Sequence, residues 1–487
     1  MSTNNTTRQP SIAISAIPLL VLIVMLALTI KLFGGDAIAG GSQLSLLTAS
    51  AVCVTIAIIG YKCSWQQLED AFVANMRSAT PAIIILLLIG AIAGTWMASG
   101  VIPTLVYYGL KILSPSIFLP ASCIICAVVS LLTGSSWTTI ATIGVALMGI
   151  GNAMGFSEGW TAGAIISGAY FGDKISIMSD TTVLAASTSE VPVFSHIKYM
   201  LTTTTVSLFI AVVVFSIAGL TGSTEAVVDI LAIEQALQDT FNITPWLLLV
   251  PVLTGLLIAK RLPAIVTLFA SALFAAIAML VFQPQIIEEI AADSSGLSSI
   301  YAIIQCATSE TAIETGNTQL NELVATSGMG GMMDTIWLII CAMCFGGVMY
   351  GSGMLSAISQ IFLRIAQRTV SVVGSTVCSG IFFNLTTGDQ YISIILTSNL
   401  FRQLYDDRGL ERKLLSRSVE DSATVTSVLI PWNSCGMTQS TVLGVATLTY
   451  LPYCIFNLAS PIVSILVAAI GYKIKKRNDN AEYALYI

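Results

Sequence analysis

Acidic side chains next to serine, threonine and glycine mark two stretches of this sequence as possible cation sites. The first stretch, residues 168–182, contains Asp173, Ser176, Ser179 and Asp180. Carboxylate, hydroxyl and carbonyl oxygens are hard ligands, which suit a small hard cation such as Na+. A carboxylate in such a site also takes up a proton, so H+ and Na+ would compete for one group.

Two glycines and a lysine add to the chemistry of this stretch. Gly168 and Gly172 let the backbone leave a helix, which would free carbonyl oxygens as further ligands. Lys174 directly follows Asp173 and could neutralise one acid when the cation leaves. The alternative for Lys174 is a structural role, in which it reaches to the membrane surface or forms an ion pair.

The second stretch, residues 417–436, carries the acid pair Glu420 and Asp421. We expect the pair to open a short apolar helix, where its charge complements the positive N-terminal end of the helix dipole. A proline and a glycine on either side of Asn433 would break this helix at membrane depth. Glu420 is either part of the site or a plain cytoplasmic cap. The ligands predicted here are Asp421, Thr424, Ser427 and Asn433.

Two short turns with a shared pattern supply further candidates. Residues 133–137 (Thr-Gly-Ser-Ser-Trp) and 387–391 (Thr-Gly-Asp-Gln-Tyr) both read Thr-Gly-x-x-aromatic. Tips of opposed re-entrant hairpins meet near the membrane midplane, where unwound backbone is tolerated beside a cavity. Asp389 is therefore a predicted ligand, with Ser135 and Ser136 as secondary candidates. The two aromatic residues are expected to pack rather than to bind.

The elements that position these residues must be membrane helices, because charge is scarce. The 487 residues include 20 Lys+Arg and 26 Asp+Glu, which is 9%, against roughly 25% in soluble domains. Hydrophobic residues make up 55%, and the mean hydropathy is +0.87. This composition excludes a disordered chain, a disulfide scaffold and an ordinary cytosolic enzyme. It favours an all-α polytopic membrane protein in the lipid bilayer, while long continuous apolar runs disfavour a β-barrel.

The placement of charge in the loops gives the predicted topology. Residues 221–244 and 284–335 carry acids without Lys or Arg, so we place them outside, and the basic clusters in the cytoplasm, including the one from Arg402 to Arg417. The apolar segments then form an inverted 5+5 repeat with interrupted helices and one re-entrant hairpin per half. Both termini would be cytoplasmic, in the inner (plasma) membrane. The predicted parts are a first inverted repeat at 1–220, an external acidic linker at 221–244 and a second inverted repeat at 245–487.

Similar motifs in the same order support such a duplication. Residues 173–179 read Asp-x-x-Ser-x-x-Ser, and residues 421–427 read Asp-x-x-Thr-x-x-Ser. Each follows one of the Thr-Gly-x-x-aromatic turns. Paired interrupted helices in corresponding positions of two halves are the best sequence pointer to the binding site of a transporter. A carboxylate at bilayer depth costs at least about 3 kcal/mol, so an acid in these helices is a functional candidate.

Other chemistries lack the residues that they need. His196 is the single histidine, and most of the ten cysteines lie in apolar runs, where their spacing favours packing over metal or redox chemistry. The sequence has no Walker motif, dinucleotide-binding GxGxxG site or nucleophile elbow. We therefore expect no enzyme, no cofactor and no nucleic-acid partner. A homodimer is compatible with the sequence.

Four segments resemble the NhaC family of Na+/H+ antiporters, namely residues 172–182, 387–391, 415–421 and 429–436. The resemblance spans most of the chain and implies a secondary antiporter of the ion-transporter superfamily that exports Na+ in exchange for H+. The family pattern usually has proline where Ile177 and Val428 stand, which can change the local backbone shape. By matching motif, the resemblance points to Asp173, Ser176, Ser179, Asp180, Asp389, Asp421 and Asn433.

The leading hypothesis is Na+/H+ antiport by alternating access, with Asp173, Asp389 and Asp421 forming a shared site for Na+ and H+ between the repeats. The alternative is a Na+- or H+-coupled transporter or exchanger of a small organic acid, of the malate/lactate type that the family also includes, or of an amino acid. Such a site needs a cationic group or helix N-termini aimed at a carboxylate, which Lys174 and residues 135–136 could supply. A channel or receptor is the third class, and the paired helix breaks disfavour it.

Overall fold

Helices joined by short connections make up the described part of the chain. The computed structural model describes residues 10–33, 40–221, 230–260, 262–292, 297–316, 320–321 and 324–474. In these ranges no strand forms, and the only extended pairing is an isolated bridge between Thr311 and Thr326. Eight helices are long and apolar enough to cross a membrane, and two bent pairs raise that number to ten. The prediction of an all-α polytopic protein is confirmed at this level.

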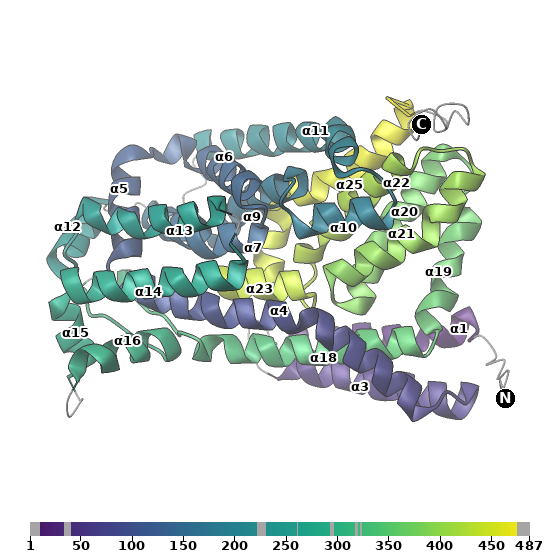
Figure 1. The fold of residues 1–487 in the computed structure, drawn as a ribbon, viewed down its shortest axis with the longest axis horizontal. Coiled ribbons are helices and arrows are strands. Elements are labelled where there is room, and N and C mark those ends of the chain that lie inside the picture. Colours follow the sequence, from purple (N-terminus) through teal and green to yellow (C-terminus); the bar gives the residue numbers. More distant parts are fainter. Residues whose placement is uncertain are drawn as a thin grey trace.

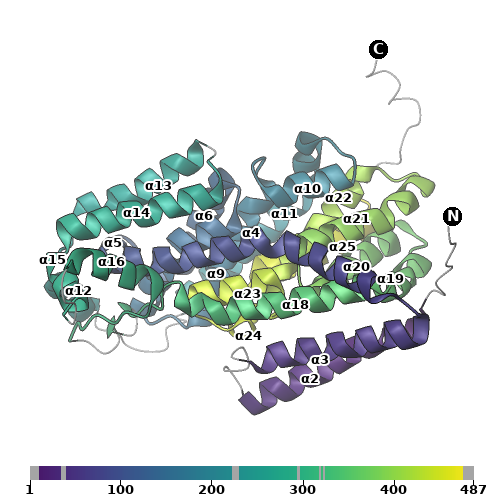
Figure 2. The same ribbon diagram turned by 60° about the horizontal axis from the view of Figure 1, so that its bottom comes forward.

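The helices run mostly along the long axis of the molecule (Figure 1). Helices α2 and α3 form a pair at one edge (Figure 2), and α3 contacts α18. The long helix α4 passes between α18 and α14 through the middle of the molecule. The elements involved are α1 (Ile12–Ser15), α2 (Ile17–Phe33), α3 (Gly41–Thr55), η2 (Ile56–Gly60), α4 (Trp65–Ala98), α14 (Ala264–Phe282) and α18 (Met333–Gly351).

The rest of the first half contains the first turn and the first helix break. Gly134 follows the end of α6, and the next residue, Ser135, caps α7. Four residues separate α9 from α10. Helices α6 and α9 lie against each other. The elements are α5 (Val101–Ile112), α6 (Pro115–Thr133), α7 (Ser136–Thr139), η3 (Ile140–Gly144), α8 (Val145–Ala153), α9 (Glu158–Ile175), α10 (Asp180–Thr188) and α11 (Val193–Leu220).

The second half begins with a connecting region and ends with the second turn and the second break. Its first elements are α12 (Ile230–Thr240), η4 (Pro245–Leu248), α13 (Leu249–Ala259), α15 (Pro284–Ile290), α16 (Ser298–Thr308) and η5 (Gly330–Met332). Its later elements are α19 (Met354–Ile365), α20 (Thr369–Thr387), α21 (Gln390–Asp407), α22 (Arg412–Val419), η6 (Glu420–Thr424), η7 (Ser427–Leu429), α23 (Ser434–Leu443), α24 (Thr447–Tyr450), η8 (Leu451–Tyr453) and α25 (Ile455–Ile470).

The glycines of α9 serve packing, which corrects the expectation that they release the backbone. The helix runs through Gly168 and Gly172 and ends only at Ile175. A Cβ atom on Gly168 would lie 2.0 Å from the Cys123 carbonyl oxygen, and one on Gly172 would lie 2.3 Å from that of Ala127. Both glycines therefore let α9 approach the backbone of α6 closely, as small residues do between membrane helices.

The acid pair lies inside a helix, so the prediction that it opens one is wrong. The π-helical segment η6 begins at Glu420 and continues directly from α22, which places both acids far from a free helix N-terminus. π-Helical turns inside helices are frequent at functional sites. The break follows later, where Ile430 is extended and Asn433 caps α23. Arg417 belongs to this buried helix and is 0% exposed, so it does not lie in an exposed loop.

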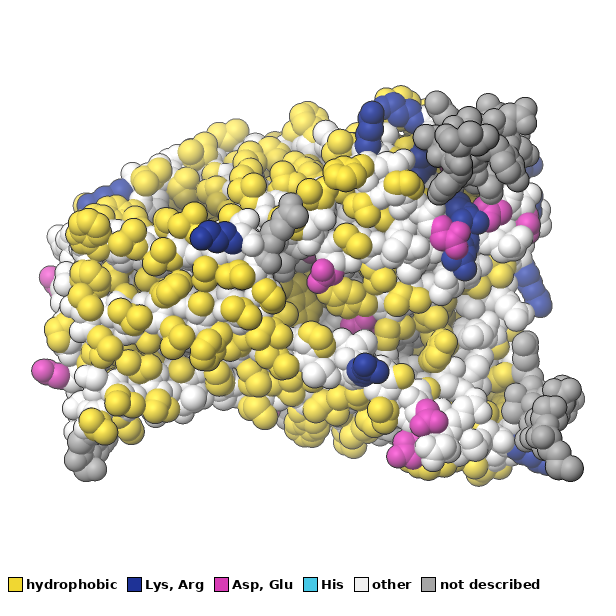
Figure 3. Space-filling model, viewed as in Figure 1, with side chains coloured by type: hydrophobic (Ala, Val, Ile, Leu, Met, Phe, Trp, Pro, Cys, Tyr) yellow, Lys and Arg dark blue, Asp and Glu magenta, His cyan; other side chains and the backbone are white. Residues whose placement is uncertain are grey.

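Apolar side chains cover most of the left and middle of the face in Figure 3, whereas charged side chains gather at its right end and a few lie near the centre. This distribution suits a protein surrounded by lipid. A hollow near the centre of the face has acidic side chains at its edge and inside it.

Candidate functional site

Two turns with the same backbone shape lie at the centre of the candidate site. Gly134 ends α6 and Gly388 ends α20, both in the left-handed conformation with φ of 68° and 69°, which favours glycine. The next residues, Ser135 and Asp389, are extended, and their side chains cap the helices that follow. The Thr-Gly-x-x-aromatic pattern thus specifies a tight helix–turn–helix connection in both places.

A threonine fastens each turn with the same hydrogen bonds. The hydroxyls of Thr133 and Thr387 accept from the backbone N–H two residues later, at 3.3 and 3.4 Å. Each lies 3.2 Å from the hydroxyl six residues later. That hydroxyl donates in turn to the carbonyl at the tip, at 2.9 and 2.7 Å. The similar sequences therefore form the same local structure.

Asp173, in the last turn of α9, faces the first of these turns. Its Oδ2 accepts hydrogen bonds from the backbone N–H of Ser136 at 3.1 Å and from the hydroxyl of Ser136 at 2.7 Å. The residue is 6% exposed. Every ion pair among the described residues involves other acids. Asp173 is therefore a buried carboxylate whose hydrogen-bond partners carry no charge.

The predicted hydroxyl ligands nearby shape the break between α9 and α10. The hydroxyl of Ser176 accepts from the backbone N–H two residues later at 3.2 Å, and that of Ser179 caps α10 by accepting from Thr182 N at 3.4 Å. Thr182 donates to the freed carbonyl of Lys174 at 3.0 Å. Asp180 begins α10 and is exposed. The sequence prediction of a broken helix carrying two acids and two hydroxyls is confirmed here.

Asp389 has an environment that mirrors that of Asp173 with the roles exchanged. It is 2% exposed, and its Oδ2 lies 3.3 Å from the hydroxyl of Ser434, the first residue of α23. The backbone N–H of Ser434 donates to the Gly388 carbonyl at 2.7 Å. In the first case the acid lies on the broken helix and Ser136 lies at the turn. In the second case the acid lies at the turn and the hydroxyl on the broken helix.

The remaining predicted ligands of the second stretch line the same region. Asn433 caps α23, and its Nδ2 donates to the Asn384 carbonyl at 3.2 Å. Ser427 donates to Gln390 Oε1 at 3.4 Å, and the buried hydroxyl of Thr424 has no hydrogen-bond partner. The ligands predicted from the sequence did not include Asn384, Gln390 or Ser434. Their nearness to the turn or the break in the sequence is the signal that could have found them.

Asp421 lies in a different, strongly charged environment. Lys174 Nζ pairs with Asp421 Oδ1, and Arg417 Nε lies 3.6 Å from Oδ2, with all three side chains 0% exposed. The hydroxyls of Thr203 and Ser460 each donate to Oδ1 at 3.1 Å. Lys174 therefore forms an ion pair in the structure, which is the structural role that we gave as its alternative. Thr203 and Ser460 were missed because they lie in the ordinary apolar helices α11 and α25.

Glu420 is a second buried acid beside this cluster. It is 0% exposed, and neither carboxylate oxygen has a hydrogen-bond partner within the described structure. The alternative that it is a plain cytoplasmic cap is therefore wrong, since such a cap would face water. A buried carboxylate without partners is costly unless it holds a proton or is paired.

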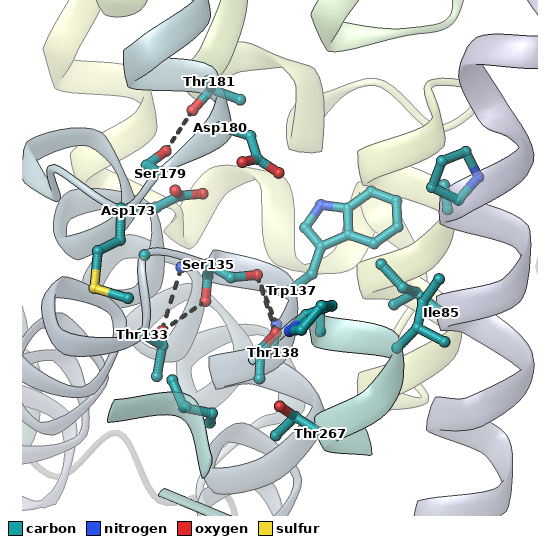
Figure 4. Close-up of a pocket in the computed structure, with 18 of the residues that line it drawn as sticks. Ile85, Thr133, Ser135, Trp137, Thr138, Asp173, Ser179, Asp180, Thr181 and Thr267 are labelled. Atoms are coloured by element: carbon teal, nitrogen blue, oxygen red, sulfur yellow. Dashed lines mark hydrogen bonds between the residues drawn. The ribbon is translucent and has the colours of Figure 1, made fainter. Parts of the chain in front are cut away.

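A pocket of about 720 Å³ opens beside Asp173. Figure 4 shows the carboxylates of Asp173 and Asp180 on one side and the indole of Trp137 across from Asp180. Its walls come from α4, the first turn, the break between α9 and α10, the connection from α13 to α14, and the start of α21. Trp137, which we expected only to pack, and Tyr391 both line it.

Asp173, Asp389 and Asp421, the acids of the predicted shared site, have separate hydrogen-bond partners. Asp173 bonds to the first turn, Asp389 to α23, and Asp421 to the cluster around Lys174. Among the described residues, no group of three or more His, Cys, Asp or Glu side chains could hold a metal ion. A Na+ ion bound here would need hydroxyl or carbonyl oxygens beside one carboxylate.

Comparison with known proteins places these features in a family. The family model described as "Na+/H+ antiporter family" matches residues 1–169 and 168–472. The Na+/H+ antiporter NhaC of Bacillus subtilis is 38% identical over 423 residues, which cover 86% of this chain and 91% of that protein.

Two further relatives have names that describe other cargoes. The malate-2H+/Na+-lactate antiporter of Bacillus subtilis is 37% identical over 84% of this chain and 85% of that protein. The arginine/ornithine antiporter ArcD of Halobacterium salinarum is 34% identical over 96% of this chain and 93% of that protein.

Proposed function

Because the chain belongs to the Na+/H+ antiporter family, we propose that it exports Na+ in exchange for H+ by alternating access. The observation that carries the proposal is Asp173. It is a buried carboxylate at a helix break, it lines a pocket, and its hydrogen-bond partners are uncharged. Such a group can bind either Na+ or H+ but has no fixed counter-charge of its own.

Exchange follows from competition for this carboxylate. When Asp173 is ionised, the N–H and O–H of Ser136 stabilise its charge, and Na+ can bind with hydroxyl or carbonyl oxygens completing its shell. Protonation removes the charge that holds Na+, so the ion leaves. A higher pH on one side therefore favours Na+ binding there. Asp389, bonded to Ser434, supplies the second acid of the proposed site.

Asp421 joins this cycle through Lys174. Because Lys174 and Arg417 already neutralise Asp421 in this structure, Na+ could bind to it only by displacing a lysine. Lys174 directly follows Asp173 in the chain, so a change at the break between α9 and α10 would move both residues together. We assign Asp421 the role of holding Lys174 in place while Asp173 exchanges its ion.

The architecture proposed for this mechanism is the inverted 5+5 repeat, with repeats at 1–220 and 245–487 and an external linker at 221–244. The matched turns at Gly134 and Gly388 support it, because the two glycines have similar dihedral angles and the threonine before each glycine makes the same hydrogen bond. Each turn would be the tip of a re-entrant hairpin. We place the protein in the cell membrane with cytoplasmic termini; residues 1–9, 222–229 and 475–487 lie outside the described ranges.

The test measures Na+/H+ exchange in proteoliposomes, as the change in an imposed pH gradient when Na+ is added. Asp173→Asn should reduce transport to background, whereas Glu69→Gln, an exposed residue at the start of α4, should leave it unchanged. Full Na+-dependent activity of Asp173→Asn would overturn the assignment. Thermal unfolding of both variants in detergent controls for loss of the fold.

Exchange of an organic acid or amino acid is the second candidate, and the size of the pocket favours it. A space of about 720 Å³ is far larger than one small cation needs and falls in the usual range for small-molecule sites. The names of two relatives describe malate–lactate and arginine–ornithine exchange. Uptake of radiolabelled dicarboxylates and amino acids, with and without a Na+ gradient, separates the two functions. Saturable uptake of a dicarboxylate or an amino acid would contradict the proposal that the protein exchanges only Na+ and H+.

A further inference from the structure

Three sulfur atoms from separate parts of the chain meet between α3 and the turn that joins α18 to α19. The Sγ of Cys53 lies 3.6 Å from the Sδ of Met349 and 3.7 Å from the Sδ of Met354. All three side chains are 0% exposed. They are not among the residues that line the pocket beside Asp173. The cluster is therefore separate from the site of the proposed exchange.

The turn itself brings the two methionines to the same side of the cysteine. Helix α18 ends at Gly351, and α19 begins at Met354 after Gly353, whose φ of 73° favours glycine. The hydroxyl of Ser352 donates to the Met349 carbonyl at 3.0 Å and accepts from the Met354 N–H at 3.4 Å. These two bonds hold the backbones of both methionines in one turn. The positions of their side chains beside α3 thus follow from the backbone.

The thiol of Cys53 has more acceptors around it than it can serve. Its single hydrogen faces the two methionine sulfurs and, at 3.6 Å, the hydroxyl oxygen of Ser352. A thiol is a weak donor with one hydrogen, so it bonds to one acceptor at a time. A metal ion in the same place would bond to all three sulfurs at once.

The type and spacing of the sulfurs indicate which metal would fit. Thiolate and thioether groups are soft ligands that select Cu(I) among biological metals. With metal–sulfur bonds of about 2.3 Å, as for zinc and thiolate, a planar three-coordinate site separates its sulfurs by about 4 Å. The two distances from Cys53 are only slightly shorter. One thiolate also cancels the charge of a monovalent ion, which avoids a net charge in this buried place.

We propose that Cys53, Met349 and Met354 bind one monovalent soft metal ion of the Cu(I) or Ag(I) class. On binding, the Cys53 thiol releases its proton to water and the thiolate bonds to the ion, whose oxidation state does not change. The two thioethers complete the shell. The bound ion links α3 to α18 and α19. This site goes beyond the proposed function and shares no residue with it.

Competition with a chromophoric Cu(I) chelator, under ascorbate, measures binding to the purified full chain in detergent. Cys53→Ser should retain one Cu(I) fewer per chain than the unaltered protein. Cys378→Ser, which removes an exposed thiol on α20, is the matched control and should keep this tightly bound ion. Equal amounts of retained Cu(I) in Cys53→Ser and Cys378→Ser would overturn the proposal, because the sulfurs would then only pack.

Met349→Leu tests the thioether ligands with little change in side-chain volume. It should weaken Cu(I) binding by at least about tenfold, since even the indirect partners of metal ligands have effects of this size. An unchanged affinity would refute the three-sulfur site. Thermal unfolding of the metal-free variants shows whether each one folds, and Met349→Leu keeps the test valid should Cys53→Ser be unstable.

A second readout follows from the link between the three helices. Because the ion binds the folded chain, Cu(I) should raise the unfolding temperature of the unaltered protein and of Cys378→Ser, but not of Cys53→Ser. An equal rise in all three would place the bound metal elsewhere and contradict the proposal. Metal-free Cys53→Ser should keep Na+/H+ exchange, so failure of the metal site and failure of the proposed function are observed separately.

Discussion

Asp173 and Asp421 stand at the same position of two similar motifs, yet their surroundings differ in charge. Asp173 accepts hydrogen bonds from the neutral groups of Ser136 and lines a pocket. Asp421 lies between Lys174 and Arg417, and all three are 0% exposed. A carboxylate that exchanges ions must be able to lose its charge, whereas one between two buried cations cannot do so cheaply. The difference separates a candidate ion-binding acid from a structural one.

The largest effect should follow from breaking the buried cluster. Asp421→Asn leaves Lys174 and Arg417 without their carboxylate, which should cost about 3–5 kcal/mol in the free energy of unfolding. Thermal unfolding in detergent and the amount of folded protein in membranes measure this loss. The double variant Lys174→Met with Asp421→Asn should recover part of it, because one buried charge is removed. An unchanged unfolding temperature in Asp421→Asn would contradict a structural role for Asp421.

The sequence predicted local structure better than it predicted contacts between the halves. The turns at Gly134 and Gly388 follow from residue types within a few positions, and a helix ends at each glycine; that each turn is the tip of a re-entrant hairpin stays a prediction. The pairing of Lys174 with Asp421 depends on residues 247 positions apart, and no local pattern encodes that distance. Glu420 was expected at a helix start because α22 was not predicted to run into it.

Contacts between distant segments also determine the role of the glycines in α9 and of the hydroxyls that were not predicted. Gly172 looks like a helix breaker in one dimension, but its role depends on the backbone of α6 beside it. Ser460 and Thr203 look like ordinary polar residues of apolar helices, and only their contacts with Asp421 distinguish them. The helix breaks that carry the candidate residues were therefore predictable from the sequence, and the partners of these residues on neighbouring helices were not.

The next effect sharpens the role of Asp173 as the exchanging acid. Ser136→Ala removes the shorter of the two hydrogen bonds to its carboxylate, which is worth about 1.5–3 kcal/mol for a charged acceptor. Without this donor the ionised form is less stable, so Asp173 should hold its proton to a higher pH. The pH at which Na+-dependent transport is half-maximal should rise by about one to two units. The pH profile in proteoliposomes measures this shift.

Ser136→Thr is the matched control for that prediction, since it keeps the hydroxyl and should restore most of the original profile. A profile in Ser136→Ala that moves to lower pH, or does not move, would falsify the link between Ser136 and the ion-binding state of Asp173.

A smaller shift in the same direction should follow from Ser434→Ala, which compares the two turns directly. Ser434 reaches Asp389 at 3.3 Å, a longer hydrogen bond than the 2.7 Å between Ser136 and Asp173. Asp389 also keeps the backbone N–H of Ile392 as a donor at 3.0 Å. We expect a change of about half a unit in the pH of half-maximal transport. A larger shift than in Ser136→Ala would make Asp389 the principal exchanging acid.

The smallest effect concerns an exposed ion-pair group, which contrasts with the buried pair of Lys174 and Asp421. Glu190 follows α10 and pairs with Arg402 at 2.8 Å and with Arg412, and it is 52% exposed. Solvent screening limits such pairs to about 1 kcal/mol or less each. Glu190→Gln should therefore lower the unfolding temperature only slightly, and high salt should abolish the difference from the parent protein. The loss in Asp421→Asn should persist in high salt, because its pair is buried. If Glu190→Gln instead stopped transport while the fold remained stable, this group would act in the transport cycle, and exposure alone would not identify structural ion pairs.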